Sequence, residues 1–163
     1  MADTHVIESK PKIIDVAPKT YLQVAVAGLV LGLFAWVVTL VVSRFIIDPL
    51  FCTTDGPNFS VCTQGGVLAS NLATIASGLL GLLALVKLGV YRPLLIVIAS
   101  AIVLWGLGTW IGAMDWYWAL IWSGLLYAIS YVAFAWLTRI RVFWIALAAV
   151  VVLVILTRII SAL

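Results

Sequence analysis

The chain has 163 residues, of which 66% are hydrophobic and only 9% are charged, and its formal net charge is +3. Soluble domains carry roughly a quarter charged residues, and one of this length could not bury so much apolar surface, so the composition excludes an ordinary soluble domain and favours a lipid environment. The basic residues are spread singly or in pairs, which argues against a nucleic-acid partner.

Long uncharged stretches follow one another along the chain, and a helix needs about 20 apolar residues to cross the hydrocarbon core of a bilayer. We therefore predict transmembrane helices near 21–46, 67–88, 93–113, 116–138 and 142–162. These runs are too long for strands of a membrane β-barrel, and their residues do not alternate between apolar and polar as such strands require. The predicted fold is an all-α integral membrane protein, a single domain over 21–163 built as a bundle of about five antiparallel helices. A flexible cytoplasmic tail is expected over 1–20, and an outer loop over 48–66.

The first apolar stretch is too long for a cleaved signal peptide and follows a polar tail, so we expect it to act as a signal anchor. The distribution of basic residues sets the orientation. With the N-terminus in the cytoplasm, the inner segments hold Lys10, Lys12, Lys19, Lys87, Arg92, Arg139 and Arg141, and the outer ones only Arg44 and Arg158. With five spans, the C-terminus then lies outside. The expected location of the protein is a plasma membrane or a bacterial inner membrane. Trp110, Trp116, Tyr117, Trp118 and Trp122 gather where the outer interface is expected, as interfacial aromatic residues do.

The outer loop contains both cysteines, Cys52 and Cys62. In an oxidising compartment we expect them to form a disulfide, which would stabilise the fold by roughly 2.5–3 kcal/mol. A redox-active pair is the alternative, but membrane oxidoreductases usually use a CxxC spacing that this loop lacks. The same loop holds an N-glycosylation sequon at Asn58, a short motif that also arises by chance.

Small residues recur at spacings of three and four in several predicted spans, and such residues let helices approach closely in lipid. The candidates for helix packing are Gly28, Gly32, Ala35, Ser77, Gly81, Gly108 and Gly112. They are expected to pack within the bundle, and the alternative is that a face without a partner in this chain docks onto another subunit. We expect the first two spans to lie in close contact through these faces.

Polar side chains on the second span, Ser70, Asn71, Thr74 and Ser77, could instead line a solute path. Four charged residues near the expected outer surface, Arg44, Asp48, Asp115 and Arg158, could bind a polar ligand, or could simply lie among lipid headgroups.

No Asp, Glu or His falls in the middle of any predicted span, and the single histidine is His5. Ionisable groups inside the membrane usually mark proton-coupled transport or catalysis. We therefore expect no enzymatic activity, no catalytic residues, no cofactor and no metal site. The favoured function is a small subunit or scaffold that packs against partner membrane proteins or against itself. A permease or channel for a neutral polar solute is the alternative, and a membrane thiol-disulfide oxidoreductase is a weaker one.

Overall fold

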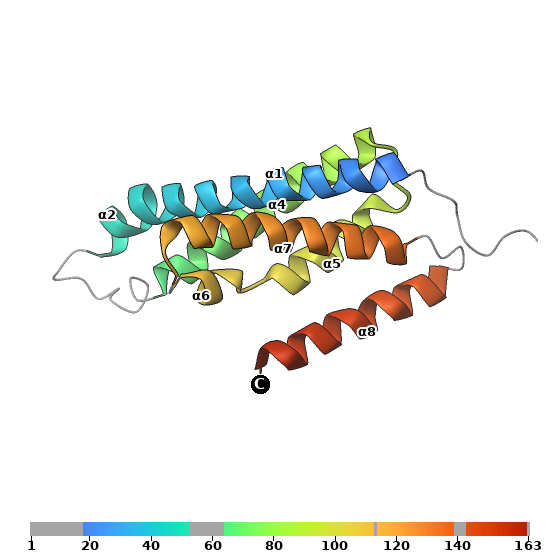
Figure 1. Cartoon of the computed structure of the whole chain (residues 1–163). Helices are drawn as coiled ribbons and strands as arrows, with labels where there is room; N and C mark the ends of the chain where they lie inside the picture. The colour runs from blue at the N-terminus through green and yellow to red at the C-terminus, as the bar shows by residue number, and fades with distance from the viewer. Residues whose placement is uncertain (1–17, 53–63, 113, 139–142, 163) are drawn as a thin grey trace, which may run out of the picture.

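The computed structural model describes residues 18–52, 64–112, 114–138 and 143–162, the last range without the side chains of residues 143, 158 and 160–162. All regular structure in these residues is helical (Figure 1). In chain order the helices are α1 (Pro18–Val42), the π-helical η1 (Ser43–Ile47), α2 (Asp48–Phe51), α4 (Gly65–Lys87), α5 (Pro93–Leu104), α6 (Leu107–Ile111), α7 (Trp116–Leu137) and α8 (Phe143–Ala162). The predicted tail over 1–20 lies outside the described residues except for its last three, which begin α1.

Three helical stretches are long and apolar enough to cross a membrane: Pro18–Phe51, Gly65–Lys87 and Trp116–Leu137. They coincide with the first, second and fourth predicted spans. The apolar helices Pro93–Leu104 and Trp144–Thr157 are shorter and cover the third and fifth predicted spans only in part. The prediction of an all-α membrane protein is therefore confirmed, whereas the count of five spans and the side on which each terminus lies remain predictions.

The first helical stretch continues beyond the predicted end at residue 46, through η1 and α2. It has 34 residues, a length of about 51 Å at 1.5 Å per residue, which exceeds the roughly 30 Å of the hydrocarbon core. Pro49 would interrupt an α-helix here, because proline lacks an N–H and its ring clashes with the carbonyl four residues earlier. The backbone widens just before it, since the Asp48 N–H donates to the carbonyl of Ser43, five residues earlier. This π-helical turn lets the helix continue past the proline.

The third predicted span is not one helix but two, separated at Trp105 and Gly106. Gly106 has φ of 86°, and Trp105 is extended. A left-handed backbone is open to glycine without steric penalty. The carbonyl of Gly106 accepts hydrogen bonds from Thr109, at 3.0 Å from the backbone N and 2.7 Å from Oγ1, so the first turn of α6 is closed locally. The prediction of a continuous helix over 93–113 was therefore wrong at this point.

α1 packs most extensively against α7 and also packs against α4 (Figure 1). α5 packs against α4 and α7, whereas α8 packs mainly against α5 and only lightly against α7. The largest fully buried side chains are those of Tyr131, Phe134, Leu85 and Ile96. The core therefore lies among α1, α4, α5 and α7, and α8 lies beside it.

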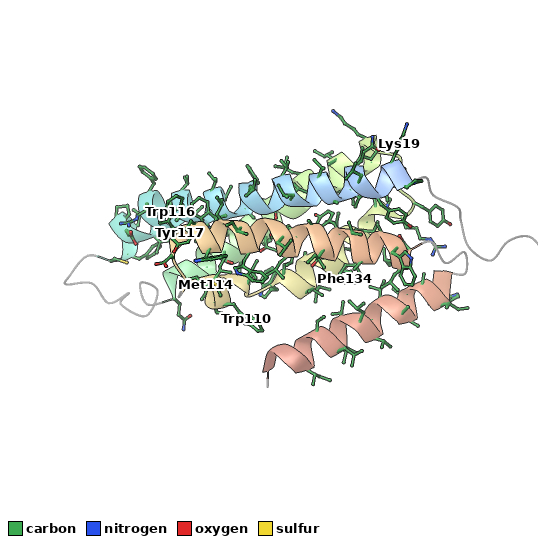
Figure 2. The ribbon with its side chains drawn as sticks, in the orientation of Figure 1. Lys19, Trp110, Met114, Trp116, Tyr117 and Phe134 are labelled. Atoms are coloured by element: carbon green, nitrogen blue, oxygen red, sulfur yellow. The ribbon has the colours of Figure 1, made fainter. Side chains whose placement is uncertain are left out.

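The two ends of the bundle differ in chemistry. Figure 2 shows Lys19 at one end and Trp110, Met114, Trp116 and Tyr117 at the other. We call these the Lys19 end and the Trp116 end. The described acidic residues, Asp48 and Asp115, belong to the Trp116 end, while Lys87 and Arg92 lie in the turn between α4 and α5 at the Lys19 end (Figure 1).

Candidate functional site

The backbones of α1 and α7 approach each other closely at two glycines of α1. A Cβ atom added to Gly32 would lie 2.6 Å from the carbonyl oxygen of Ser123 and 2.7 Å from the Cα of Gly124. One added to Gly28 would lie 2.8 Å from the Cα of Ala128. Only glycine allows such backbone contact, and Ser123 Oγ uses it to donate a 2.9 Å hydrogen bond to the carbonyl of Gly32. The glycine face of α1 therefore meets α7, so the prediction that this face contacts the second span was wrong.

The other small residues that the sequence singled out lie in different surroundings. A Cβ on Gly81 would collide with Oη of Tyr131, and one on Gly108 would lie 2.5 Å from Cβ of Ser70. Ala35 is buried. Gly112 faces only the carbonyl of Gly108, and no other described residue lies within 4 Å of its added Cβ.

Hydroxyl groups of α4 and α7 form a buried hydrogen-bonded network. Ser77 Oγ donates to the carbonyl of Thr74 at 3.0 Å and lies 3.0 Å from Tyr127 Oη. Thr74 Oγ1 donates to the carbonyl of Ser70 at 2.9 Å. Ser70 Oγ in turn accepts the Gly108 N–H at 3.1 Å, next to the break between α5 and α6. One continuous network thus joins α4, α6 and α7.

Asn71 Oδ1 on α4 and Ser100 Oγ on α5 are buried polar atoms with no hydrogen-bond partner among the described residues. Ser100 is only 1% exposed. An unpaired buried polar group destabilises a fold by about 1–3 kcal/mol, so these atoms are places where a water or a polar solute would be stabilised. The predicted solute path, Ser70, Asn71, Thr74 and Ser77, is thus an interior polar column.

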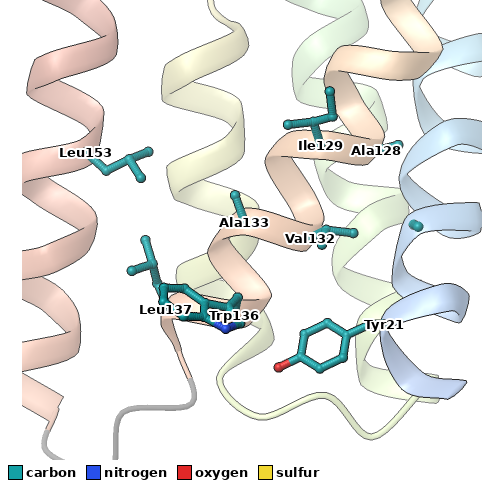
Figure 3. Close-up of a pocket in the computed structure, with 9 residues that line it drawn as sticks. Tyr21, Ala128, Ile129, Val132, Ala133, Trp136, Leu137 and Leu153 are labelled. Atoms are coloured by element: carbon teal, nitrogen blue, oxygen red, sulfur yellow. The ribbon is translucent and has the colours of Figure 1, made fainter. Parts of the chain in front are cut away.

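Several of the open spaces in the structure border α8. A groove of about 650 Å³ lies between α1, α7 and α8 (Figure 3) and we call it the α1–α7 groove. Its lining is Tyr21, Ala25, Ala128, Ile129, Val132, Ala133, Trp136, Leu137 and Leu153. A second groove of about 590 Å³ separates α5 from α8, and we call it the α5–α8 groove. Smaller spaces lie at the α5–α6 break, about 250 Å³, and between α1 and α4, about 450 Å³.

None of these four spaces is lined by a residue of the predicted solute path. Ser70, Thr74 and Ser77 are instead buried, and their hydroxyls bond to one another's backbone or to α6 and α7. These three hydroxyl groups are therefore engaged in hydrogen bonds within the bundle.

The predicted outer charge cluster is only partly described. Arg44, Asp48 and Asp115 are exposed and share the Trp116 end, while the side chain of Arg158 lies outside the described residues. Tyr117 Oη donates to Asp115 Oδ2 at 3.2 Å. Cys52 lies at the C-terminal end of α2. Cys62 and Asn58 lie outside the described residues, so the disulfide and the sequon remain predictions. Among the described residues no group of three or more His, Cys, Asp or Glu side chains could hold a metal ion.

Sequence reasoning missed the α7 half of the polar network. Ser123, Tyr127 and Tyr131 are all buried. They recur every fourth residue, so they share one helix face, and that spacing in an apolar span was a signal for an interior polar face. The chain matches no protein-family model, and no curated protein or solved structure is significantly similar to it.

Proposed function

We propose that this protein is a non-enzymatic membrane subunit that works by packing against a transmembrane helix of a partner membrane protein or of a second copy. The observation that carries the proposal is the α1–α7 groove. Three alanines, Ala25, Ala128 and Ala133, contribute to its lining beside larger apolar side chains, and Tyr21 points toward Trp136 at one end (Figure 3). Small side chains let a passing helix come close, and that contact is what stabilises helix association in lipid.

The internal glycine contacts support this reading. Gly28 and Gly32 already contact the backbone of α7, so this glycine face of α1 is not open to a further helix. α8 makes contact mainly with α5 and borders the α1–α7 groove only through Leu153. The groove is therefore the place where the chain can accept one more helix.

Site-specific photo-crosslinking in native membranes tests the proposal. A photoreactive residue at Ile129, which lines the groove, is compared with one at Ile145, which does not, and each isoleucine is 56% exposed. We expect a discrete protein adduct from position 129, and only lipid adducts from position 145. The substitution Ala133→Phe, which fills the groove, should abolish that adduct, while Ala148→Phe on the exposed side of α8 should leave it unchanged. Lipid adducts alone at position 129, or equal protein adducts at both positions, would refute the proposal.

We further infer the finer topology: five spans, a cytoplasmic N-terminus, an external C-terminus and a Cys52–Cys62 disulfide in the outer loop. Three cations, Lys19, Lys87 and Arg92, belong to the Lys19 end of the described helices, and this supports a cytoplasmic location for that end. A topology reporter fused at Leu163 should read out as external, and a cytoplasmic reading would contradict five spans. Non-reducing electrophoresis should separate wild type from Cys52→Ser if the disulfide is present.

A permease for a neutral polar solute is the second candidate, and the buried atoms without partners, Asn71 Oδ1 and Ser100 Oγ, favour it. Flux of a panel of small neutral solutes is measured in proteoliposomes. If the polar column is the path, Asn71→Leu should reduce the flux, whereas Thr39→Val should not, because the Thr39 hydroxyl bonds only within α1. No flux above protein-free vesicles would rule this candidate out.

A further inference from the structure

The break between α5 and α6 exposes one backbone peptide group. Trp105 has φ −63° and ψ 122°, and Gly106 has φ 86° and ψ 7°, which are the dihedral angles of a type II turn with glycine at its third position. The peptide between these two residues is the central one of the turn, so neither its C=O nor its N–H takes part in the turn's own hydrogen bond. Among the described residues the Trp105 carbonyl accepts no hydrogen bond and the Gly106 N–H donates none.

This peptide group lies beside the middle of a helix that is long enough to cross a membrane. It belongs to the wall of the cavity of about 250 Å³ at the break, which is also lined by Leu126 and Ser130 of α7. About 15 Å of α7 extends from Leu126 in each direction. In the hydrocarbon region, backbone outside a helix is tolerated only where protein buries it or where it lines a water-filled cavity. We therefore expect a polar occupant in this cavity.

Two hydroxyl residues add to the polar part of the wall. Ser130 is half-buried, and its hydroxyl forms no hydrogen bond within the part of the chain that the structure describes. The Thr157 hydroxyl of α8 donates to the carbonyls of Leu153, at 3.0 Å, and Val154, at 2.8 Å, so its oxygen remains only as an acceptor. The wall thus offers hydrogen-bond donors, the Gly106 N–H and the Ser130 hydroxyl, together with acceptors on the turn and on both hydroxyls.

The rest of the wall is apolar. Trp105 and Trp110 contribute aromatic residues, and the others are leucines and one valine. No charged side chain of the described residues lines the cavity, so an ion would lose its hydration there without gaining a counter-charge. Small-molecule sites typically combine an apolar and aromatic wall with a few polar groups. A neutral molecule with several hydroxyl groups suits this wall, because each hydroxyl both donates and accepts and the C–H groups can pack against the rings.

We propose that the cavity at the α5–α6 break binds a small neutral polyol of about the size of glycerol, with its hydroxyl groups on the Trp105–Gly106 peptide and on Ser130. The space of about 250 Å³ is several times the roughly 30 Å³ that one water occupies in the liquid, so a three-carbon polyol fits. The cavity shares no lining residue with the α1–α7 groove. Binding there requires neither a partner helix nor flux through the polar column, so it can be tested separately from both proposed functions.

Saturation-transfer difference NMR of the purified full chain in detergent micelles tests the site, with glycerol as the probe. Wild type should give a saturable signal. Ser130→Ala removes one hydroxyl from the wall and should weaken glycerol binding about fivefold, the effect of one net hydrogen bond. Thr39→Val is the matched control, because the Thr39 hydroxyl bonds within α1 and does not line the cavity. An equal loss in both variants, or no saturable signal from wild type, would overturn the proposal.

A second pair of variants tests the location of the site. Leu126→Phe fills the cavity and should abolish the glycerol signal, whereas Leu125→Phe, at an exposed position of the same helix that does not line the cavity, should leave it unchanged. Far-UV circular dichroism confirms that the helix content of each variant is retained. A glycerol signal that persists in folded Leu126→Phe would show binding elsewhere and refute the site.

Competing probes test the chemical class of the ligand. Propan-1-ol has the three carbons of glycerol but a single hydroxyl, so it should bind at least fivefold more weakly, by the loss of one or more hydrogen bonds. Urea has no hydroxyl group and should fail to displace glycerol at equal concentration. Displacement by urea, or propan-1-ol binding as tightly as glycerol, would contradict a polyol site.

Discussion

The contact between α1 and α7 makes a sharp prediction for Gly32→Ala. The added methyl carbon would lie 2.6 Å from the Ser123 carbonyl oxygen and 2.7 Å from the Cα of Gly124. Both atoms are backbone, so neither can rotate away, and the helices must separate. Overpacking of this kind destabilises a protein by about 1–3 kcal/mol. The separation would also lengthen the 2.9 Å hydrogen bond from Ser123 Oγ to the Gly32 carbonyl, so we expect the upper part of that range.

Gly78→Ala is the matched control. It makes the same chemical change inside a membrane helix, but the added carbon would lie 3.6 Å from Val97 Cγ1, an ordinary contact. Alanine also has the higher helix propensity, by about 1 kcal/mol, so this variant should be neutral or slightly stabilised. The free energy of unfolding is measured by SDS titration in mixed micelles, followed by far-UV circular dichroism. Equal shifts for the two variants would refute the reasoning that backbone contact at Gly32 holds α1 to α7.

Three further variants test the network, a second glycine contact and the break in the third apolar segment. Tyr127→Phe removes the hydroxyl that lies 3.0 Å from Ser77 Oγ. It should lower the free energy of unfolding by about 0.6 kcal/mol, the average for side-chain hydrogen bonds in a membrane protein. An unchanged free energy of unfolding in SDS titration would show that this hydrogen bond does not stabilise the fold. Gly81→Ala should destabilise through contact with Oη of Tyr131, and adding Tyr131→Phe should restore part of the loss, so an additive double mutant would contradict the contact. Gly106→Ala meets no described atom within 4 Å but has φ of 86°. It should therefore be less stable by about 1–2 kcal/mol through backbone strain alone, and an unchanged thermal midpoint would argue against the break.

The membrane character of the chain could be predicted from local chemistry. Apolar stretches such as 21–46 and 116–138 exceed the length that a bilayer requires, and three of the described helical stretches confirm it. The spacing of Gly28 and Gly32 indicated a close helix contact, because only residues three and four apart share a helix face. These properties depend on residue type and interval along one helix.

The partner in that contact could not be predicted. Gly28 and Gly32 face α7, although α4 follows α1 directly in the chain. The small-residue pattern is similar on several spans, so it does not predict which helix faces will contact each other. The polar column was likewise visible on one helix, but that Ser77 meets Tyr127 depends on how α4 and α7 pack.

The break at Gly106 also could not be predicted from the sequence. The residues around it are apolar, and averaged hydropathy reads them as one span. Only the packed structure places the Gly108 N–H against Ser70 Oγ, which gives a partner to a backbone group at the start of α6. By itself, then, the sequence determined that the chain belongs in lipid and which faces of its helices are small or polar, because these follow from composition and helical periodicity. The tertiary structure alone decided which faces meet, where the third apolar segment breaks and that α8 leaves grooves beside the bundle, because these depend on contacts between residues far apart in the chain.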